Sequence, residues 1–218
     1  MIGLGIVSYK SVNISSAKED NRNLVSSINI ETLQLKLIQA DKELTPIKHE
    51  RNGDIFYTYK NKPGDKELSI SEIKQRIRLG SDFYINERQK INNILRRLNE
   101  LGINNKLVFL NNGAHGLWDP SKITIYIDKK VIEKGSPTFL DVLRHEIIHV
   151  SQSCFNGSKN SFPKRIGLPL KFSKRININL SHNLYNRNPK EINFLEREAF
   201  SYSQIDGAAL KLLNKFCG

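Results

Sequence analysis

Apolar residues recur along the chain in two rhythms, one typical of helices and one typical of short strands. Spacing by three and four residues predicts helices, and it occurs over 31–44, 69–79, 91–101, 138–154, 189–206 and 208–216. Alternation of β-branched or aromatic residues with polar ones predicts strands, and it occurs over 54–59, 106–110 and 123–127. The mixture favours an α+β fold in which a small twisted sheet packs on helices.

Some of the predicted helices carry residues that satisfy free backbone groups at their ends. Ser69 and Glu72 have the spacing of a capping box, and Thr138 with Asp141 offers a second N-terminal cap. Gly102 supplies a C-terminal stop. These signals predict where three of the helices begin or end.

The chain shows no internal repeat and no linker that would separate two domains. Residues 1–28 are polar and rich in Ser and Asn, which predicts an N-terminal arm. Residues 29–218 are expected to form one domain, with a turn at 62–65. Whether the arm acts as a pro-segment is left open.

Composition narrows the class of protein. With 218 residues, 39% of them hydrophobic, the chain is long enough to bury a core. A mean hydropathy of -0.44 without a long apolar run argues against a membrane span. The net charge of +12 suits nucleic acid, an anionic surface or an acidic substrate, but a general drift toward Lys, Asn and Ile would also produce it. Cys154 and Cys217 either form one disulfide or remain two buried thiols.

The segment with recognisable chemistry is His145-Glu146-Ile147-Ile148-His149, which matches H-E-x-x-H inside the predicted helix 138–154. Residues four apart share a helix face, so the two histidines can point imidazole nitrogens at one ion. The glutamate lies about 100° further round the helix, where it can reach a water molecule beside that ion. The pattern predicts a catalytic metal site.

A catalytic zinc site needs a third protein ligand. The remaining histidines, none of which follows His149 at the spacing of an extended histidine motif, are His49, His115 and His182. The helix predicted at 189–206 offers Glu196 and Glu198 instead. These two carboxylates lie about 200° apart on a helix, so both cannot face the same ion.

The pairing of the H-E-x-x-H motif with a downstream Glu-Ala helix resembles the gluzincin branch of zinc metallopeptidases. The form His-Glu-Ile-Ile-His-Val-Ser-Gln, followed by Glu-Arg-Glu-Ala-Phe and Gln204, is similar to small bacterial and phage-borne zincin-like peptidases. The match covers about Thr138 to Gln204. It implies a zincin-like fold and a zinc-dependent hydrolase of peptide bonds. Since no signal peptide is evident at residues 1–8, a cytoplasmic or phage-associated location is favoured over secretion.

The resemblance also implies a role for each site residue. His145, His149 and Glu198 are expected to bind Zn²⁺, because Glu198 holds the place of the Glu before Ala, and Glu196 remains the alternative. Glu146 is expected to act as the general base of a metalloprotease that uses a metal-activated water. Candidates for the donor that stabilises the oxyanion are His182, Tyr185 and Tyr202.

Two features bear on the substrate. The strand predicted at 123–127 stands where zincins place the edge strand that binds an extended peptide.

No acidic residue lies between Glu146 and Glu191, and this stretch is expected to form a cationic wall that favours an acidic peptide or a polyanion. A solvated loop made basic by general drift is the alternative. The basic residues of the stretch are Lys159, Lys164, Arg165, Lys171, Lys174, Arg175, Arg187 and Lys190.

Two rival classes stay open beside the peptidase. One is a nucleic-acid-associated protein, which the net charge of +12 would suit. The other is an interaction module that keeps a zincin fold without turnover. The presence of Glu146 argues against the second class, because a purely structural metal site does not need that carboxylate.

Overall fold

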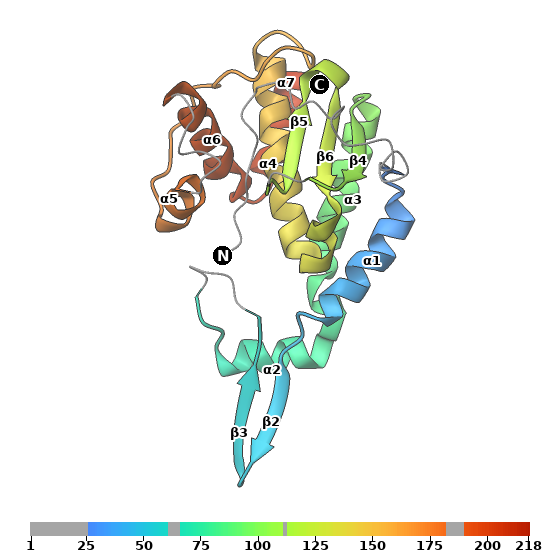
Figure 1. Cartoon of the computed structure of the whole chain (residues 1–218), viewed down its shortest axis with the longest axis vertical. Coiled ribbons are helices and arrows are strands. Elements are labelled where there is room, and N and C mark those ends of the chain that lie inside the picture. The colour runs from blue at the N-terminus through green and yellow to red at the C-terminus, as the bar shows by residue number, and fades with distance from the viewer. Residues whose placement is uncertain (1–25, 61–65, 111–112, 182–189) are drawn as a thin grey trace.

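The computed structural model describes residues 26–60, 66–110, 113–181 and 190–218, and it shows an α+β fold (Figure 1). This confirms the predicted fold class. The predicted turn at 62–65 and residues 1–25 of the predicted arm lie outside the described residues. The end of that arm differs from the prediction, because Ser26–Ser27 form strand β1 of the sheet and the Ile28 amide donates to the Asn105 carbonyl.

The main sheet has the strand order β1-β4-β6-β5. Strands β4 (Asn104–Val108) and β6 (Thr124–Asp128) are parallel, and β5 (Gly116–Asp119) pairs with β6 in the antiparallel direction. The expectation that residues 123–127 form the edge strand is wrong, because β6 is paired with β4 on one side and with β5 on the other. The edge strands are β1 and β5, and the sequence pattern missed β5 because its Trp-Asp-Pro end is typical of a turn.

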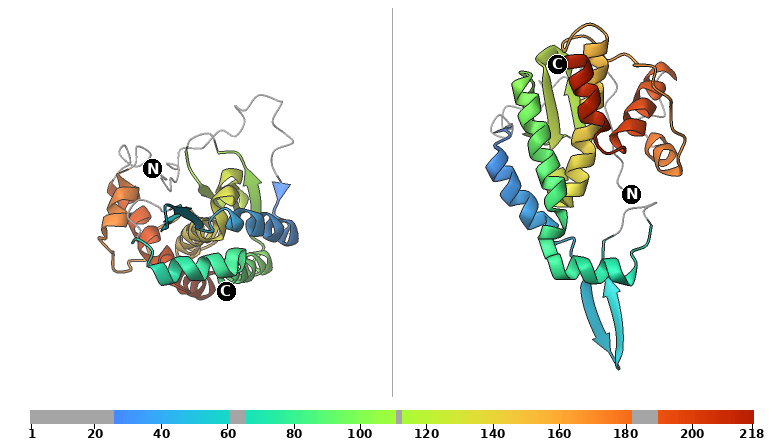
Figure 2. Two further views of the ribbon diagram at one scale, coloured as in Figure 1. Left: turned by 90° about the horizontal axis from the view of Figure 1, so that it is seen from below. Right: turned by 180° about the vertical axis from the view of Figure 1, so that it is seen from behind.

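Helix α4 (Gly135–Phe155) is the centre of the structure. The sheet covers one side of it and helices cover the others (Figures 1 and 2), so 16 of its 21 residues are buried, polar ones among them. The helices in contact with α4 are α1 (Ile30–Lys42), α3 (Ile85–Glu100), α6 (Lys190–Ser203) and α7 (Ala208–Cys217).

The first turn of α4 is held by a carboxylate from another helix. Asp41 of α1 is fully buried and accepts from the Ser136 amide and hydroxyl at 2.7 Å each, and from the Arg88 guanidinium at 2.6 Å. Gly135 makes room for it, since an added Cβ would lie 2.9 Å from Asp41 Oδ1. The predicted cap at Thr138 is therefore wrong, because its hydroxyl donates to the Lys134 carbonyl within the helix.

A two-stranded hairpin projects from the lower end of the body (Figure 1). Strand β2 (Ile47–Arg51) pairs with β3 (Asp54–Thr58) across the turn Asn52–Gly53, where both residues have positive φ. Strand β3 was predicted and β2 was not. Helix α2 (Ile70–Leu79) crosses the base of the hairpin and begins at the predicted capping box, with Ser69 and Glu72 bonded reciprocally.

The C-terminal part adds three helices and a disulfide. Helix α5 (Lys174–Leu180) lies in a stretch without regular spacing of apolar residues, so it was not predicted. Helices α6 and α7 occur close to the predicted ranges. Cys154 at the end of α4 and Cys217 at the end of α7 form a disulfide with 5.4 Å between their Cα atoms. Of the two alternatives left open by the sequence, the structure shows the paired one.

Within the described ranges, no helix is both long and apolar enough to cross a membrane.

We predict that unfolded, unreduced protein contains no titratable thiol. A Cys154→Ser/Cys217→Ser double variant is expected to lose about 2–4 kcal/mol of unfolding free energy, because the bond closes a long loop in the unfolded chain. Urea unfolding of the oxidised protein, the reduced protein and the double variant measures this loss. Reduced wild type is the control and should match the variant. Two thiols per unreduced chain would contradict the pairing.

Candidate metal centre

The two motif histidines meet at the middle of α4. His145 and His149 are one helical turn apart and almost fully buried, and their Nε2 atoms are 3.1 Å apart. Such a close approach of two imidazole nitrogens in the core indicates that both are aimed at one point. The predicted sharing of one helix face is therefore realised in the structure.

Glu196 of α6 completes the group. Its Oε2 atom lies 3.2 Å from His145 Nε2 and 3.4 Å from His149 Nε2, and the carboxylate is 1% exposed. Possible ligand atoms of the three residues all lie within 4.8 Å of one another. Two imidazoles and one carboxylate form a donor set suited to a transition metal. The group is thus compatible with a metal site.

Glu198, the expected third ligand, points elsewhere. Its carboxylate is fully buried and accepts from Gln152 Nε2 at 2.8 Å and from three consecutive amides of the α4–α5 connection, those of residues 166, 167 and 168, at 2.9–3.0 Å. The expectation is corrected in favour of Glu196. The reason is helical geometry, since residues two apart on α6 face nearly opposite directions and only one can meet the histidines.

Gln152 links the two arrangements and was missed by the sequence analysis. Because its Nε2 donates to Glu198, its Oε1 faces His149 and accepts from Nδ1–H at 2.7 Å. This contact leaves His149 Nε2 directed at Glu196 and fixes the ring orientation, the usual role of a partner behind a metal-binding histidine. A usable signal was present, because Gln152 follows His149 at a spacing of three in the predicted helix.

Glu146 faces the edge strand β5. Its side chain is 1% exposed, and a Cβ added to Gly116 would lie 2.8 Å from its Cδ atom. The Trp118 backbone amide donates to the carboxylate. Glu146 Oε2 and His145 Nδ1 are two of the seven buried side-chain atoms without a hydrogen-bond partner among the described residues. A buried carboxylate oxygen left without a partner is costly, and this one belongs to a side chain that interacts with His149 and Glu196.

Burial and mutual contact set opposite protonation states on these neighbours. Burial lowers the pKa of His145 to about 4 and raises the pKa of Glu146 to about 8. Burial also disfavours the charged forms of His149 and Glu196, but the attraction between these two side chains outweighs that effect. The pKa of His149 therefore rises to about 9, and the pKa of Glu196 falls to about 2. At neutral pH the residues therefore hold one imidazolium facing one carboxylate. A cation bound here would replace that proton.

The other candidate residues are not brought to this group. His49 lies on the hairpin, 2.9 Å from the Thr58 hydroxyl, and His115 Nε2 lies 2.8 Å from Lys134 Nζ. The Tyr202 hydroxyl donates to the Pro169 carbonyl at 3.2 Å. The remaining candidates lie outside the described residues: His182 and Tyr185.

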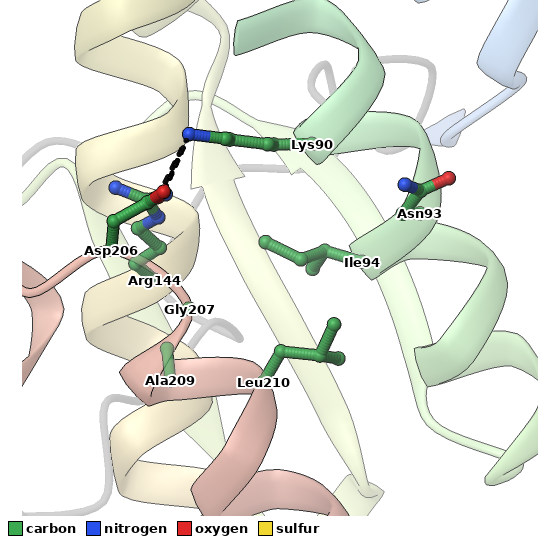
Figure 3. Close-up of a pocket in the computed structure, with 8 residues that line it drawn as sticks. All are labelled: Lys90, Asn93, Ile94, Arg144, Asp206, Gly207, Ala209 and Leu210. Atoms are coloured by element: carbon green, nitrogen blue, oxygen red, sulfur yellow. Dashed lines mark hydrogen bonds and ion pairs between the residues drawn. The ribbon is translucent and has the colours of Figure 1, made fainter. Parts of the chain in front are cut away.

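A separate pocket of about 120 Å³ lies between α3, α4 and α7 (Figure 3). Asp206 accepts from Lys90 Nζ at 2.8 Å and also pairs with Arg144, so one carboxylate is shared by two basic groups at the rim. None of the three residues of the metal-compatible group lines it. The lining residues are Lys90, Asn93, Ile94, Arg144, Asp206, Gly207, Ala209 and Leu210.

The two glutamates of α6 provide a matched test. We predict that wild type binds one divalent metal ion per chain and that Glu196→Gln binds none. Glu198→Gln should keep the ion, with an affinity lower by about 10–100-fold because the support behind His149 is weakened. Elemental analysis and competition titration with a chelator measure both. Metal retained by Glu196→Gln and lost from Glu198→Gln would reverse the assignment.

A second prediction concerns Gly116. In Gly116→Ala the new methyl group would meet the Glu146 carboxylate at less than contact distance, so we expect the carboxylate to move while the metal group stays intact. Unfolding free energy should fall by about 1–3 kcal/mol, as for overpacking of a core, with metal content unchanged. Gly113→Ala, where an added Cβ has open space but the positive φ by itself disfavours alanine, measures backbone strain without a steric contact. Unchanged stability in Gly116→Ala would contradict the close contact.

Comparisons of the chain with protein-family models, with curated proteins and with solved structures find no match. The function is therefore inferred from the convergence of His145, His149 and Glu196, with Glu146 buried beside them.

Proposed function

We propose that the protein is a zinc-dependent hydrolase of peptide bonds. The observation that carries the proposal is the convergence of His145, His149 and Glu196, with the carboxylate of Glu146 buried beside them. Three protein ligands with a nearby general base form the donor set of a catalytic zinc site, whereas structural zinc sites use four ligands. The H-E-x-x-H part of the resemblance to gluzincins supports the same class. The Glu-Ala part does not, because Glu198 binds Gln152 and the α4–α5 connection instead of the histidine pair.

The roles of the chain's own residues follow from their positions. His145, His149 and Glu196 would hold the ion, which supplies Lewis acidity for the scissile carbonyl and lowers the pKa of a water molecule when bound. A bound cation would lower the pKa of Glu146 from the raised value that burial sets. The ionised carboxylate would then accept the proton of the attacking water at Oε2, which no described residue engages, and pass it to the leaving amine. Gln152 keeps His149 in the orientation that directs Nε2 toward the ion.

Strand β5 is suited to hold the substrate. It is one of the two edge strands of the sheet, β1 being the other, and it contacts α4 beside Glu146. An extended peptide can add to such an edge through main-chain hydrogen bonds, which places a peptide carbonyl close to the base. Binding would therefore depend on backbone more than on side-chain identity.

The disulfide bears on the compartment. A reducing cytosol keeps thiols unpaired, whereas oxidising compartments stabilise disulfides. The Cys154–Cys217 bond thus favours an oxidising compartment over the cytoplasmic location expected from the sequence.

The proposal is tested with Glu146→Gln. We expect hydrolysis of a mixed library of quenched fluorescent peptides to fall by about 10²–10⁴-fold in this variant, because the proton acceptor is lost. Metal content should stay at the wild-type level, which separates loss of the base from loss of the ion. Glu100→Gln, a change of the same kind on the surface of α3, is the control. Chelation should abolish activity, and zinc should restore it.

Activity that survives in Glu146→Gln, or in Glu196→Gln stripped of metal, would contradict the mechanism. Absence of hydrolysis in the wild-type protein loaded with zinc would instead favour the interaction module.

A further inference from the structure

The surface formed by α6 and the α4–α5 connection carries aromatic and basic side chains. On α6 the carboxylates of Glu196 and Glu198 are buried. Phe194 and Arg197 lie one turn apart on the same helix, and both side chains are at least partly exposed. We call the surface built around them the α5–α6 face. Its residues are Arg165, Lys171, Phe172, Lys174, Phe194 and Arg197.

Contacts between the α4–α5 connection and α6 make this face continuous. The Arg165 guanidinium lies 5.5 Å from the ring centroid of Phe194, and that of Arg197 lies 4.5 Å from the ring of Phe172. The Lys171 amide donates to the Ser201 hydroxyl at 2.9 Å. The Glu198 carboxylate anchors the same connection from behind through its three amides. These contacts therefore hold the basic and aromatic side chains in defined positions on the surface.

Most basic residues of this face come from the stretch expected to form a cationic wall along the substrate cleft. Phe194 lies about 200° from Glu196 around α6, so its ring, with the Arg165 guanidinium over it, points away from the carboxylate that meets the histidines. In Figure 1, α5 and α6 form the outer left flank of the molecule, separated from the sheet by α4.

The chemistry of the face combines positive charge with exposed apolar rings. The side chain of Phe172 is 68% exposed and that of Phe194 is 42% exposed, although phenylalanine is usually buried. Basic side chains attract anionic headgroups, and aromatic rings prefer the boundary between headgroups and acyl chains. Aromatic rings also stack with nucleic-acid bases, but here a guanidinium already lies over one face of each ring.

We propose that the α5–α6 face docks the protein on the surface of an anionic phospholipid membrane. Phe172 enters the interface and Lys171, Lys174 and Arg165 contact the headgroups, while the body of the protein stays in water. This inference does not depend on peptidase activity.

The test uses the full chain and flotation with vesicles of phosphatidylcholine, either alone or with about 30 mol% phosphatidylglycerol. We expect binding to the anionic vesicles only, weakening with added salt. Lys171→Glu/Lys174→Glu should lower the partition coefficient by at least about tenfold, since each basic residue near the surface contributes. Phe172→Ser should lower it by about fivefold or more without changing the charge.

Matched controls lie on α1 and α2, away from the face. Lys36→Glu/Lys74→Glu changes the net charge by the same amount, and Leu35→Ser removes a side chain that is 69% exposed. Both should bind nearly as wild type does. Metal content and thermal unfolding of all variants check that the fold is intact.

Equal losses in the face variants and their controls would show attraction by net charge alone and overturn the proposal. So would absence of binding to anionic vesicles at low salt. Tight binding of a single-stranded oligonucleotide that depends on Phe172 and Lys171, without vesicle binding, would overturn it in favour of a nucleic-acid partner.

Discussion

The buried polar contact between α4 and α6 is the interaction on which the rest of the site depends. Glu196 meets His145 and His149, and Glu198 meets Gln152, so two carboxylates of one helix are matched to polar groups of the other. Buried carboxylates are strongly destabilising unless each has partners. The contact therefore fixes how α6 lies on α4, because another rotation of either helix would leave charges unpaired.

The same contact positions elements beyond the two helices. Through Glu198 it holds the α4–α5 connection against α6, and this places Arg165 and Phe172 on the outer side. On the other side of α4, Glu146 lies against β5 at a position where only glycine leaves it room. Helix α4 thus directs three ionisable side chains at two different neighbours. His145 and His149 face α6, and Glu146 faces β5.

Much of the local structure followed from the sequence. The capping box at Ser69, the hydrophobic spacing of α3 and the alternation of β6 each predict their element, because these signals act between residues close together in the chain. The shared face of His145 and His149 is predictable for the same reason, since helix geometry alone sets it. The sequence also limited the third ligand to Glu196 or Glu198, because both cannot face one ion.

The tertiary structure decided what depends on contacts between distant segments. It selected Glu196 over Glu198, replaced the expected cap at Thr138 by Asp41 of α1, and made β5 rather than β6 an edge strand of the sheet. It also paired Cys154 with Cys217. Residue spacing determines which side chains share a face, but only the packing of one element on another determines what that face meets.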